Sequence, residues 1–293
     1  MILLLLIPAI VTSVVGSLVY KKNDKPSYMA LFSNIVWGVI IGAVSFGLGF
    51  ILFDDVFANI TWATMGMIIF QSVIGSLCVL TWAKGVKDVP CSIADPFSQM
   101  RMFFMLGISW LIFNDTATSI DIILVCVIFL ACMTMGIWQY KSEQHKGSKK
   151  YFWGLLWLCV WVLLSTANLG SMRMIADNGV HITTFVFFSG FITALICLPV
   201  FFFTKKINKE TLQCSFKDKW LAGIGITDNI WILFYIPLAM VLNLGVLDAI
   251  MVVAPALVVV FGLFLFREKI KWYIYPLIVI ILGCAIALSL LST

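Results

Sequence analysis

Long apolar runs follow one another along almost the whole chain, and they limit what it can fold into. A helix needs about 20 apolar residues to cross the hydrocarbon core of a bilayer. Lipid offers no hydrogen bonds to the backbone, so spanning segments are restricted to helices and closed barrels. The spans that we predict are residues 2–20, 28–52, 61–82, 90–112, 118–138, 151–173, 180–203, 220–240, 245–266 and 270–291. The predicted fold class is therefore all-α: a polytopic membrane protein with ten transmembrane helices.

The composition excludes the common soluble classes. Hydrophobic residues make up 62% of the chain and charged residues 11%, whereas soluble proteins have roughly 45–50% and about 25%. A water-soluble enzyme and a disordered chain are both incompatible with these values. The net charge of +5 is modest and is spread over short gaps between apolar runs, so we expect no nucleic-acid partner. The expected partners are the lipid bilayer and a small-molecule substrate, and a homodimer is left open.

The basic residues alternate from gap to gap. All but two of the 19 Lys and Arg residues lie in the gaps that follow odd-numbered spans; the exceptions are Arg101 and Arg173. Loops rich in Lys and Arg stay in the cytoplasm. We therefore expect the odd-numbered gaps to face the cytoplasm and both termini to face outward.

A basic stretch near the middle divides the chain into two similar units. Residues 141–150 are predicted to be a cytoplasmic linker between a five-helix unit at 1–140 and another at 151–293. Because five is an odd number, the second unit must cross the membrane in the opposite direction. Inverted repeats of this kind are a recurring plan of secondary transporters, with the substrate site near the midplane.

A few residues recur between the two units. Gly16 and Ser17 match Gly170 and Ser171 at an offset of 154 positions. Asp95 matches Asp248 at an offset of 153 positions. These matches favour a repeat but are few.

The ninth predicted span carries a short motif. Ala254-Pro255 is followed by Phe264-Leu265-Phe266-Arg267-Glu268-Lys269-Ile270. With ten spans and about 290 residues, the chain resembles the ten-helix, EamA-like branch of the drug/metabolite transporter superfamily. The first unit departs from the motif, since Met102 takes the place of Pro255. The resemblance implies a cavity lined by helices of both units and the inner membrane of a bacterium, but no particular substrate.

Four ionisable residues stand out inside predicted spans, where each costs roughly 2.5–3.5 kcal/mol and needs a reason. Arg101 lies roughly 16 Å along its helix, near the midplane. Its forked donors suit a carboxylate or phosphate, so it is a candidate anchor for a substrate anion. The alternative is a structural pair with Asp95, Asp228 or another carboxylate.

The three acidic residues have different expected roles. Asp228 could hold a substrate amine, bind a coupling proton or form a structural salt bridge. Asp95 either begins a helix or continues a polar face toward Arg101. Asp248 is expected near the outer surface as a polar helix start, which the helix dipole favours.

Buried amides and deep aromatic residues complete the predicted site. Asn168 and Gln71 need hydrogen-bond partners inside the membrane; Asn34 is a weaker candidate of the same kind. The deep tryptophans Trp161 and Trp231 could form an aromatic wall around a ligand, with packing as the alternative. Trp37 and Trp157 are also deep.

We expect no metal site and no cofactor. The eight cysteines have no C-x-x-C spacing, and the chain holds only two histidines. A phosphate-binding loop of the G-x-x-x-x-G-K-S/T type is also absent from the sequence, which excludes ATP-driven transport by this chain alone.

The predicted function is secondary active transport of a small polar metabolite, such as an amino acid, with proton coupling as an option. In this interpretation Arg101 holds the anion, and Asp228 holds an amine or a proton. One alternative is efflux of organic cations or drugs by the same fold. Another is a membrane scaffold or subunit that transports nothing. An enzyme is not expected, because no nucleophile–base pair or metal cluster emerges.

Overall fold

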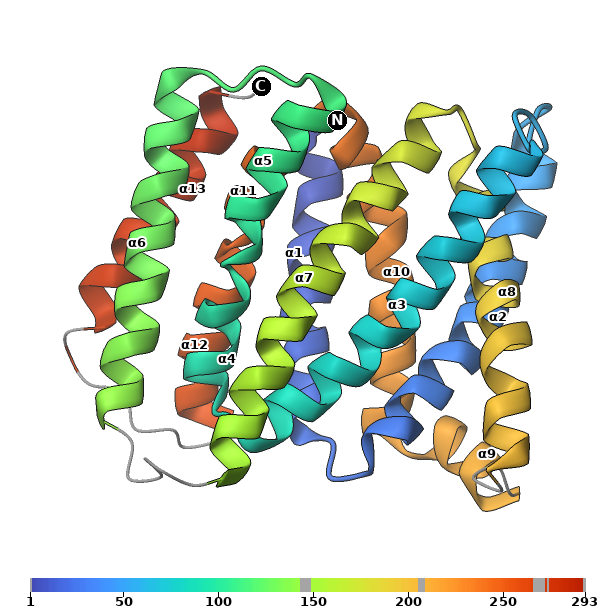
Figure 1. The fold of residues 1–293 in the computed structure, drawn as a ribbon, viewed down its shortest axis with the longest axis horizontal. Coiled ribbons are helices and arrows are strands. Elements are labelled where there is room, and N and C mark those ends of the chain that lie inside the picture. Colours follow the sequence, from blue (N-terminus) through green and yellow to red (C-terminus); the bar gives the residue numbers. More distant parts are fainter. Residues whose placement is uncertain (1, 143–148, 205–208, 266–271, 273, 292–293) are drawn as a thin grey trace.

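The computed structural model describes residues 2–142, 149–204, 209–265, 272 and 274–291. In these residues every regular element is an α-helix. Eight segments are long and apolar enough to cross a membrane. The chain is therefore an all-α, multi-pass membrane protein in its architecture (Figure 1).

Thirteen helices occur in the described part of the chain. In order they are α1 (Ile2–Lys22), α2 (Ser27–Leu52), α3 (Trp62–Asp88), α4 (Cys91–Ser98), α5 (Arg101–Phe113), α6 (Ser119–Ser142), α7 (Lys149–Asp177), α8 (Ile182–Phe203), α9 (Lys209–Lys217), α10 (Lys219–Val241), α11 (Leu244–Met251), α12 (Val253–Leu265) and α13 (Ile274–Leu291).

Eight of the ten predicted ranges coincide with segments that qualify as spans. The range 118–138 lies within α6, whose qualifying apolar stretch, Ser119–Met135, is shorter. The range 90–112 is not one helix, because it holds both α4 and α5. Most of the linker predicted at 141–150 lies outside the described residues, between α6 and α7.

Two predicted spans are broken helices, which corrects the expectation of continuous ones. At the end of α4 the amide of Met100 donates to the carbonyl of Phe97 at 3.1 Å, so the chain tightens to i→i+3 bonding there. The second break falls at Val252, between α11 and α12. Pro255 has no N–H to donate to the carbonyl of Met251, which removes a helical hydrogen bond at this place. The short helix α9 was also not predicted.

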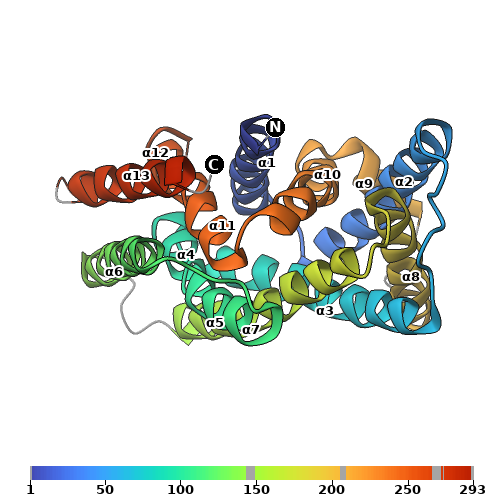
Figure 2. The same cartoon turned by 90° about the horizontal axis from the view of Figure 1, so that it is seen from above.

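Two groups of helices are joined by α1 and α7. Figure 2 shows α4, α5, α6, α11, α12 and α13 on one side and α2, α8 and α9 on the other. Between them, α1 packs against both α10 and α12, and α7 packs against both α3 and α5.

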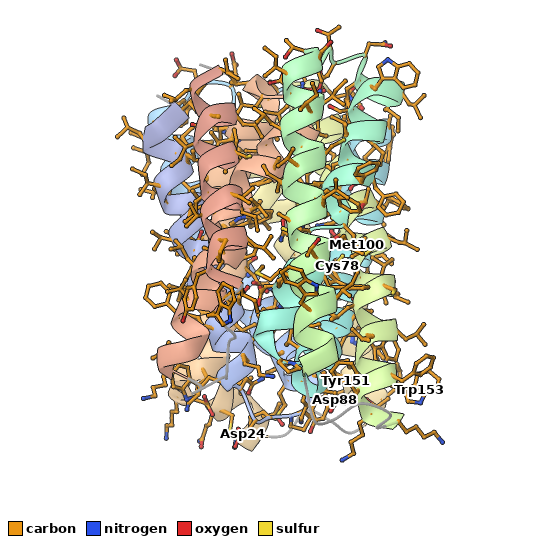
Figure 3. The ribbon with its side chains drawn as sticks, turned by 90° about the vertical axis from the view of Figure 1, so that its left-hand side faces the viewer. Asp24, Cys78, Asp88, Met100, Tyr151 and Trp153 are labelled. Carbon is orange, nitrogen blue, oxygen red and sulfur yellow. The ribbon has the colours of Figure 1, made fainter. Side chains whose placement is uncertain are left out.

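The two termini lie at one end of the bundle, and several lysines mark the other. The loop after α1, with Lys25, and the end of α3, with Lys87, lie opposite the termini (Figure 1). Figure 3 places Asp24 and Asp88 at this same end, and Met100 near mid-height. The break between α4 and α5 is therefore deep in the bundle.

Glycines allow α2 to lie against α8. A Cβ atom at Gly190 would lie 2.6 Å from the carbonyl oxygen of Gly38, and one at Gly42 would lie 3.0 Å from the Cα of Phe187. The G-x-x-x-G of Gly38 and Gly42 thus supports close backbone approach, as small residues do between membrane helices.

Candidate functional site

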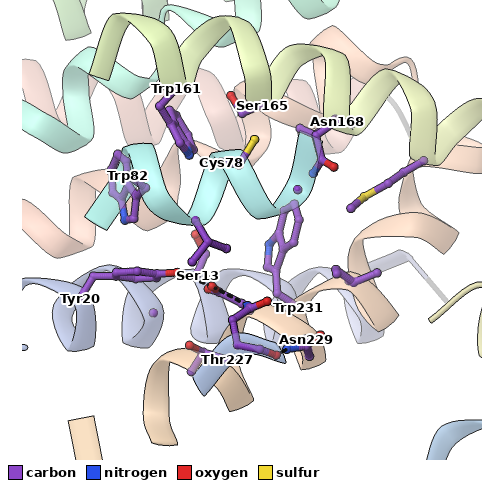
Figure 4. Close-up of a pocket in the computed structure, with 18 of the residues that line it drawn as sticks. Ser13, Tyr20, Cys78, Trp82, Trp161, Ser165, Asn168, Thr227, Asn229 and Trp231 are labelled. Carbon is purple, nitrogen blue, oxygen red and sulfur yellow. Dashed lines mark hydrogen bonds between the residues drawn. The ribbon is translucent and has the colours of Figure 1, made fainter. Parts of the chain in front are cut away.

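A cavity of about 230 Å³ lies between the two groups of helices (Figure 4). Residues of both predicted units line it, from α1, α2, α3, α4 and α5 and from α7, α8, α10, α11 and α12. All seven predicted site residues are among them: Gln71, Asp95, Arg101, Trp161, Asn168, Trp231 and Asp228. The structure thus places all seven residues around one cavity. Their roles in binding a substrate stay predictions.

Arg101 is held by Asp248. Its Nε and one terminal nitrogen each donate to a different oxygen of the Asp248 carboxylate, both at 2.7 Å. The Asp248 side chain is 1% exposed and that of Arg101 is 13% exposed. Of the two interpretations of Arg101, the structure contains the pair with a carboxylate, and the partner is Asp248, which the sequence analysis did not name for this role.

The expectation for Asp248 was wrong. Asp248 is not a polar helix start near the surface but a buried residue facing α5. The start of α11 is capped by Asn243, whose side-chain oxygen accepts from the amides of Gly245 and Val246. Asn243 therefore acts as the N-cap of α11. Asp248 lies about one turn further along the helix and is not the capping residue.

One tryptophan lies beside the guanidinium group of Arg101, and a second packs against the first. Its Cζ lies 5.4 Å from the centre of the Trp161 ring, which is within the range of a cation–π contact. The rings of Trp161 and Trp82 are 4.7 Å apart. Figure 4 shows these two tryptophans together, with Tyr20 facing the same cavity.

Asp228 is bonded only by neutral donors in the part of the chain that the structure describes. The Tyr20 hydroxyl donates to Oδ2 of Asp228, and the Asn34 amide donates to the same oxygen at 3.1 Å. Tyr20 reaches α10 because Gly16, one turn earlier, lets the helices approach: a Cβ there would lie 3.3 Å from Thr227. The pair with Arg101 that the sequence left open for Asp228 is not formed.

Asp95 is buried beside α1. The Ser17 hydroxyl donates to Oδ1 of Asp95 at 3.0 Å. The hydroxyl of Ser98 donates to the Asp95 carbonyl at 2.6 Å, within the tightened end of α4. Asp95 lines the cavity, as its predicted polar face requires. The same helix, α1, therefore provides partners for both Asp95 and Asp228.

The two amides predicted as cavity residues bond to each other. Gln71 Nε2 donates to Asn168 Oδ1 at 3.1 Å, and the Ser189 hydroxyl donates to Gln71 Oε1 at 2.8 Å. This network links α3, α7 and α8 across one wall of the cavity.

The deep tryptophans divide into two sets. Trp231 lines the cavity and stacks on Tyr235 at 4.3 Å between ring centres. Trp37 and Trp157 are not cavity residues: Trp37 donates to the carbonyl of Ser215 at 3.2 Å, and Trp157 lies 4.0 Å beneath Lys84 Nζ.

Sequence reasoning missed three contributors to the site: Tyr20, Ser17 and Ser189. Tyr20 falls at the end of a predicted span, where a tyrosine is expected at the membrane interface. The spacing of Ser13, Ser17 and Tyr20 is a local signal that α1 presents a polar face to other helices.

No protein-family model and no curated protein matches the sequence. Among solved structures, 28 chains match. One, described only as a crystal structure of a protein, has a TM-score of 0.67 and 15% sequence identity over 99% of this chain and 96% of its own. At that identity the likeness shows a shared fold alone. Residues 266–270 of the motif that suggested a family lie outside the described residues.

Proposed function

We propose that this chain is a secondary active transporter of a small polar metabolite, working by alternating access. The observation that carries the proposal is a polar cavity deep in an apolar helical bundle, lined by charges of both signs. Ionisable groups are expensive at membrane depth and mark substrate or ion pathways.

The two broken helices support a ten-span inverted repeat as part of this proposal. α4 and α11 have the same length, and each is followed by a break and a 13-residue helix, α5 or α12. Their starts, Cys91 and Leu244, differ by 153 positions, the offset of Asp95 and Asp248. Interrupted helices at corresponding places in two halves are typical of transporter binding sites.

Packing supports the same correspondence. α1 packs against α10 and α12, and α7 packs against α3 and α5. With α1 matched to α7, α3 to α10 and α5 to α12, the two sets of neighbours are equivalent. We therefore propose two repeat units, at 1–140 and 151–293. As further parts of the proposal, the chain belongs to the EamA-like branch and lies in a bacterial inner membrane. The distribution of Lys and Arg supports an orientation with both termini outside.

Efflux of organic cations or drugs is the second candidate, and one observation favours it. Arg101 bonds the Asp248 carboxylate through Nε and one terminal nitrogen, whereas Asp228 faces the cavity with neutral partners. A scaffold that transports nothing is the third candidate. Such a protein needs no hydrated polar cavity, so the accessibility of the cavity separates it from both transporters.

Access to the cavity from each side of the membrane tests the proposal. Single cysteines at Ser98 and Ser165, which line the cavity, would be introduced into a chain without its native cysteines. A membrane-impermeant charged thiol reagent is then added to right-side-out or to inverted vesicles. We expect both positions to react from either side. The matched control is Leu163→Cys, on the exposed face of α7, which faces lipid in this proposal and should stay unreactive. Cavity positions that resist the reagent from both sides would remove transport as the function.

A further inference from the structure

The charges around the cavity do not balance. Of its described lining residues, Arg101 is the only one with a permanent positive charge, whereas Asp95 and Asp228 are acidic. Arg101 is neutralised by Asp248, which lies behind the cavity wall. With that pair set aside, the described lining holds two acidic side chains, Asp95 and Asp228, and no basic one. A site with this balance attracts cations and disfavours anions.

The two oxygens of Asp228 differ in their surroundings. Tyr20 and Asn34 both donate to Oδ2. No described residue donates to Oδ1, although a carboxylate can accept about four hydrogen bonds in all. Asp228 is only partly buried and lines the cavity. The carboxylate is thus fixed by its neighbours on one side and available to a ligand on the other.

Aromatic faces lie next to this carboxylate. Trp231 follows Asp228 by three positions on α10, which places both on one face of the helix. Tyr20 also lines the cavity and contacts Asp228 directly. A cation beside tyrosine or tryptophan rings gains further electrostatic attraction, most strongly for tryptophan. Trp231 projects toward the cavity in Figure 4.

We propose that Oδ1 of Asp228 anchors a protonated amine, so that the molecule bound in this cavity is a small organic ammonium ion. The inference rests on the proposed transport function and narrows its substrate. Arg101 stays paired with Asp248 and takes no part in holding a substrate anion. A zwitterion would bring a carboxylate group into a cavity whose described lining offers one guanidinium, already paired in charge with Asp248.

Ligand-induced stabilisation of the purified full-length chain in detergent tests this site. The probes are 2-phenylethylamine, the uncharged 2-phenylethanol and the carboxylate 3-phenylpropionate, with 1-aminopentane and 1-pentanol as an aliphatic pair. A ligand that binds the folded state raises the melting temperature by mass action. We expect both amines to raise it and the alcohols and the carboxylate to have no effect.

The substitution Asp228→Asn keeps the shape of the side chain and removes its charge. We expect it to weaken amine binding at least about tenfold, since hydrogen bonds to a charged group are the stronger kind. Asp54→Asn makes the same chemical change at an exposed residue outside the cavity and should leave amine binding unchanged. If Asp228→Asn does not fold, Asp228→Glu replaces it and should keep the preference for amine over alcohol.

Several results would overturn the ammonium site. For the unsubstituted chain, they are an unchanged melting temperature with both amines, or equal increases with the alcohols or the carboxylate. For the variants, they are undiminished amine binding in Asp228→Asn, or loss of the preference for amine over alcohol in Asp228→Glu. The accessibility of Ser98→Cys and Ser165→Cys is a separate measurement. If those cysteines react from both sides while amines do not bind, transport stands and the ammonium site fails. If they react from neither side, the proposed function fails whatever the amines do.

Discussion

Arg101 and Asp248 lie 147 positions apart in the chain and are joined by two hydrogen bonds of 2.7 Å. The pair connects the first residue of α5 to α11, so it ties one broken helix to the other. Both side chains are largely buried. A bidentate contact of this kind fixes direction as well as distance, because the guanidinium fork matches the carboxylate.

Breaking the pair on one side should cost much more than removing it entirely. We expect Arg101→Met and Asp248→Leu each to lower the free energy of unfolding by about 3–5 kcal/mol, because each leaves a buried charge alone. The double variant should be more stable than either single one. Unfolding in a mixed-detergent titration measures all three.

Asp177→Asn is the control for the ion pair. Asp177 pairs with Arg173 at 2.7 Å one helical turn away and is more exposed than Asp248. Its loss should change the free energy of unfolding by less than about 1 kcal/mol. Additive losses in the Arg101–Asp248 double variant would mean that the two side chains do not depend on each other.

Close packing of α2 against α8 should depend on Gly190. The substitution Gly190→Ala places a Cβ 2.6 Å from the backbone oxygen of Gly38, which cannot move aside as a flexible side chain would. We expect a lower melting temperature, by the mechanism of overpacking. Gly47→Ala on α2 is the matched control, because nothing lies within 4 Å of its Cβ position. Alanine has a higher helix propensity than glycine, so Gly47→Ala should not lower the melting temperature. Equal melting temperatures for Gly47→Ala and Gly190→Ala would contradict the packing argument.

Hydropathy predicted where the membrane helices lie, because burial in lipid requires the same apolar runs that the sequence displays. It did not predict the breaks at Gln99–Met100 and at Val252, because the chain stays apolar or helix-compatible on both sides of each break. Pro96 and Pro255 are nearby signals, but proline also occurs inside unbroken membrane helices, as Pro199 does in α8.

The seven residues named from the sequence line one cavity, but the sequence did not point to Tyr20, Ser17 or Ser189 and did not predict the pairing. Polar residues inside spans had to face a cavity or one another, and this argument brought Asp228, Asn168 and Gln71 to one list. It could not choose the partner of Arg101, since Asp95, Asp228 and Asp248 are chemically equivalent. That choice depends on which helices pack together, and no local pattern records it.

The amide network of Gln71, Asn168 and Ser189 should stabilise the wall that it spans. Asn168→Ala removes the acceptor of the Gln71 amide group and should lower the free energy of unfolding by about 1–3 kcal/mol. The control is Thr134→Val on α6, whose hydroxyl bonds only to the carbonyl of Leu130 in its own helix among the described residues. An Asn168→Ala chain as stable as the Thr134→Val chain would mean that water satisfies Gln71 equally well.

The distribution of lysines should set the orientation of the chain in the membrane. Asp55 lies exposed in the loop between α2 and α3, at the same end as the termini (Figure 1), and Lys150 lies exposed at the start of α7, at the opposite end. Single cysteines would replace each in a chain without native cysteines. In intact bacterial cells with a permeabilised outer membrane, an impermeant maleimide should label Asp55→Cys and leave Lys150→Cys unlabelled. Both should react once the inner membrane is opened. Labelling of Lys150→Cys alone in intact cells would place the termini inside, and the positive-inside argument would then fail for this chain.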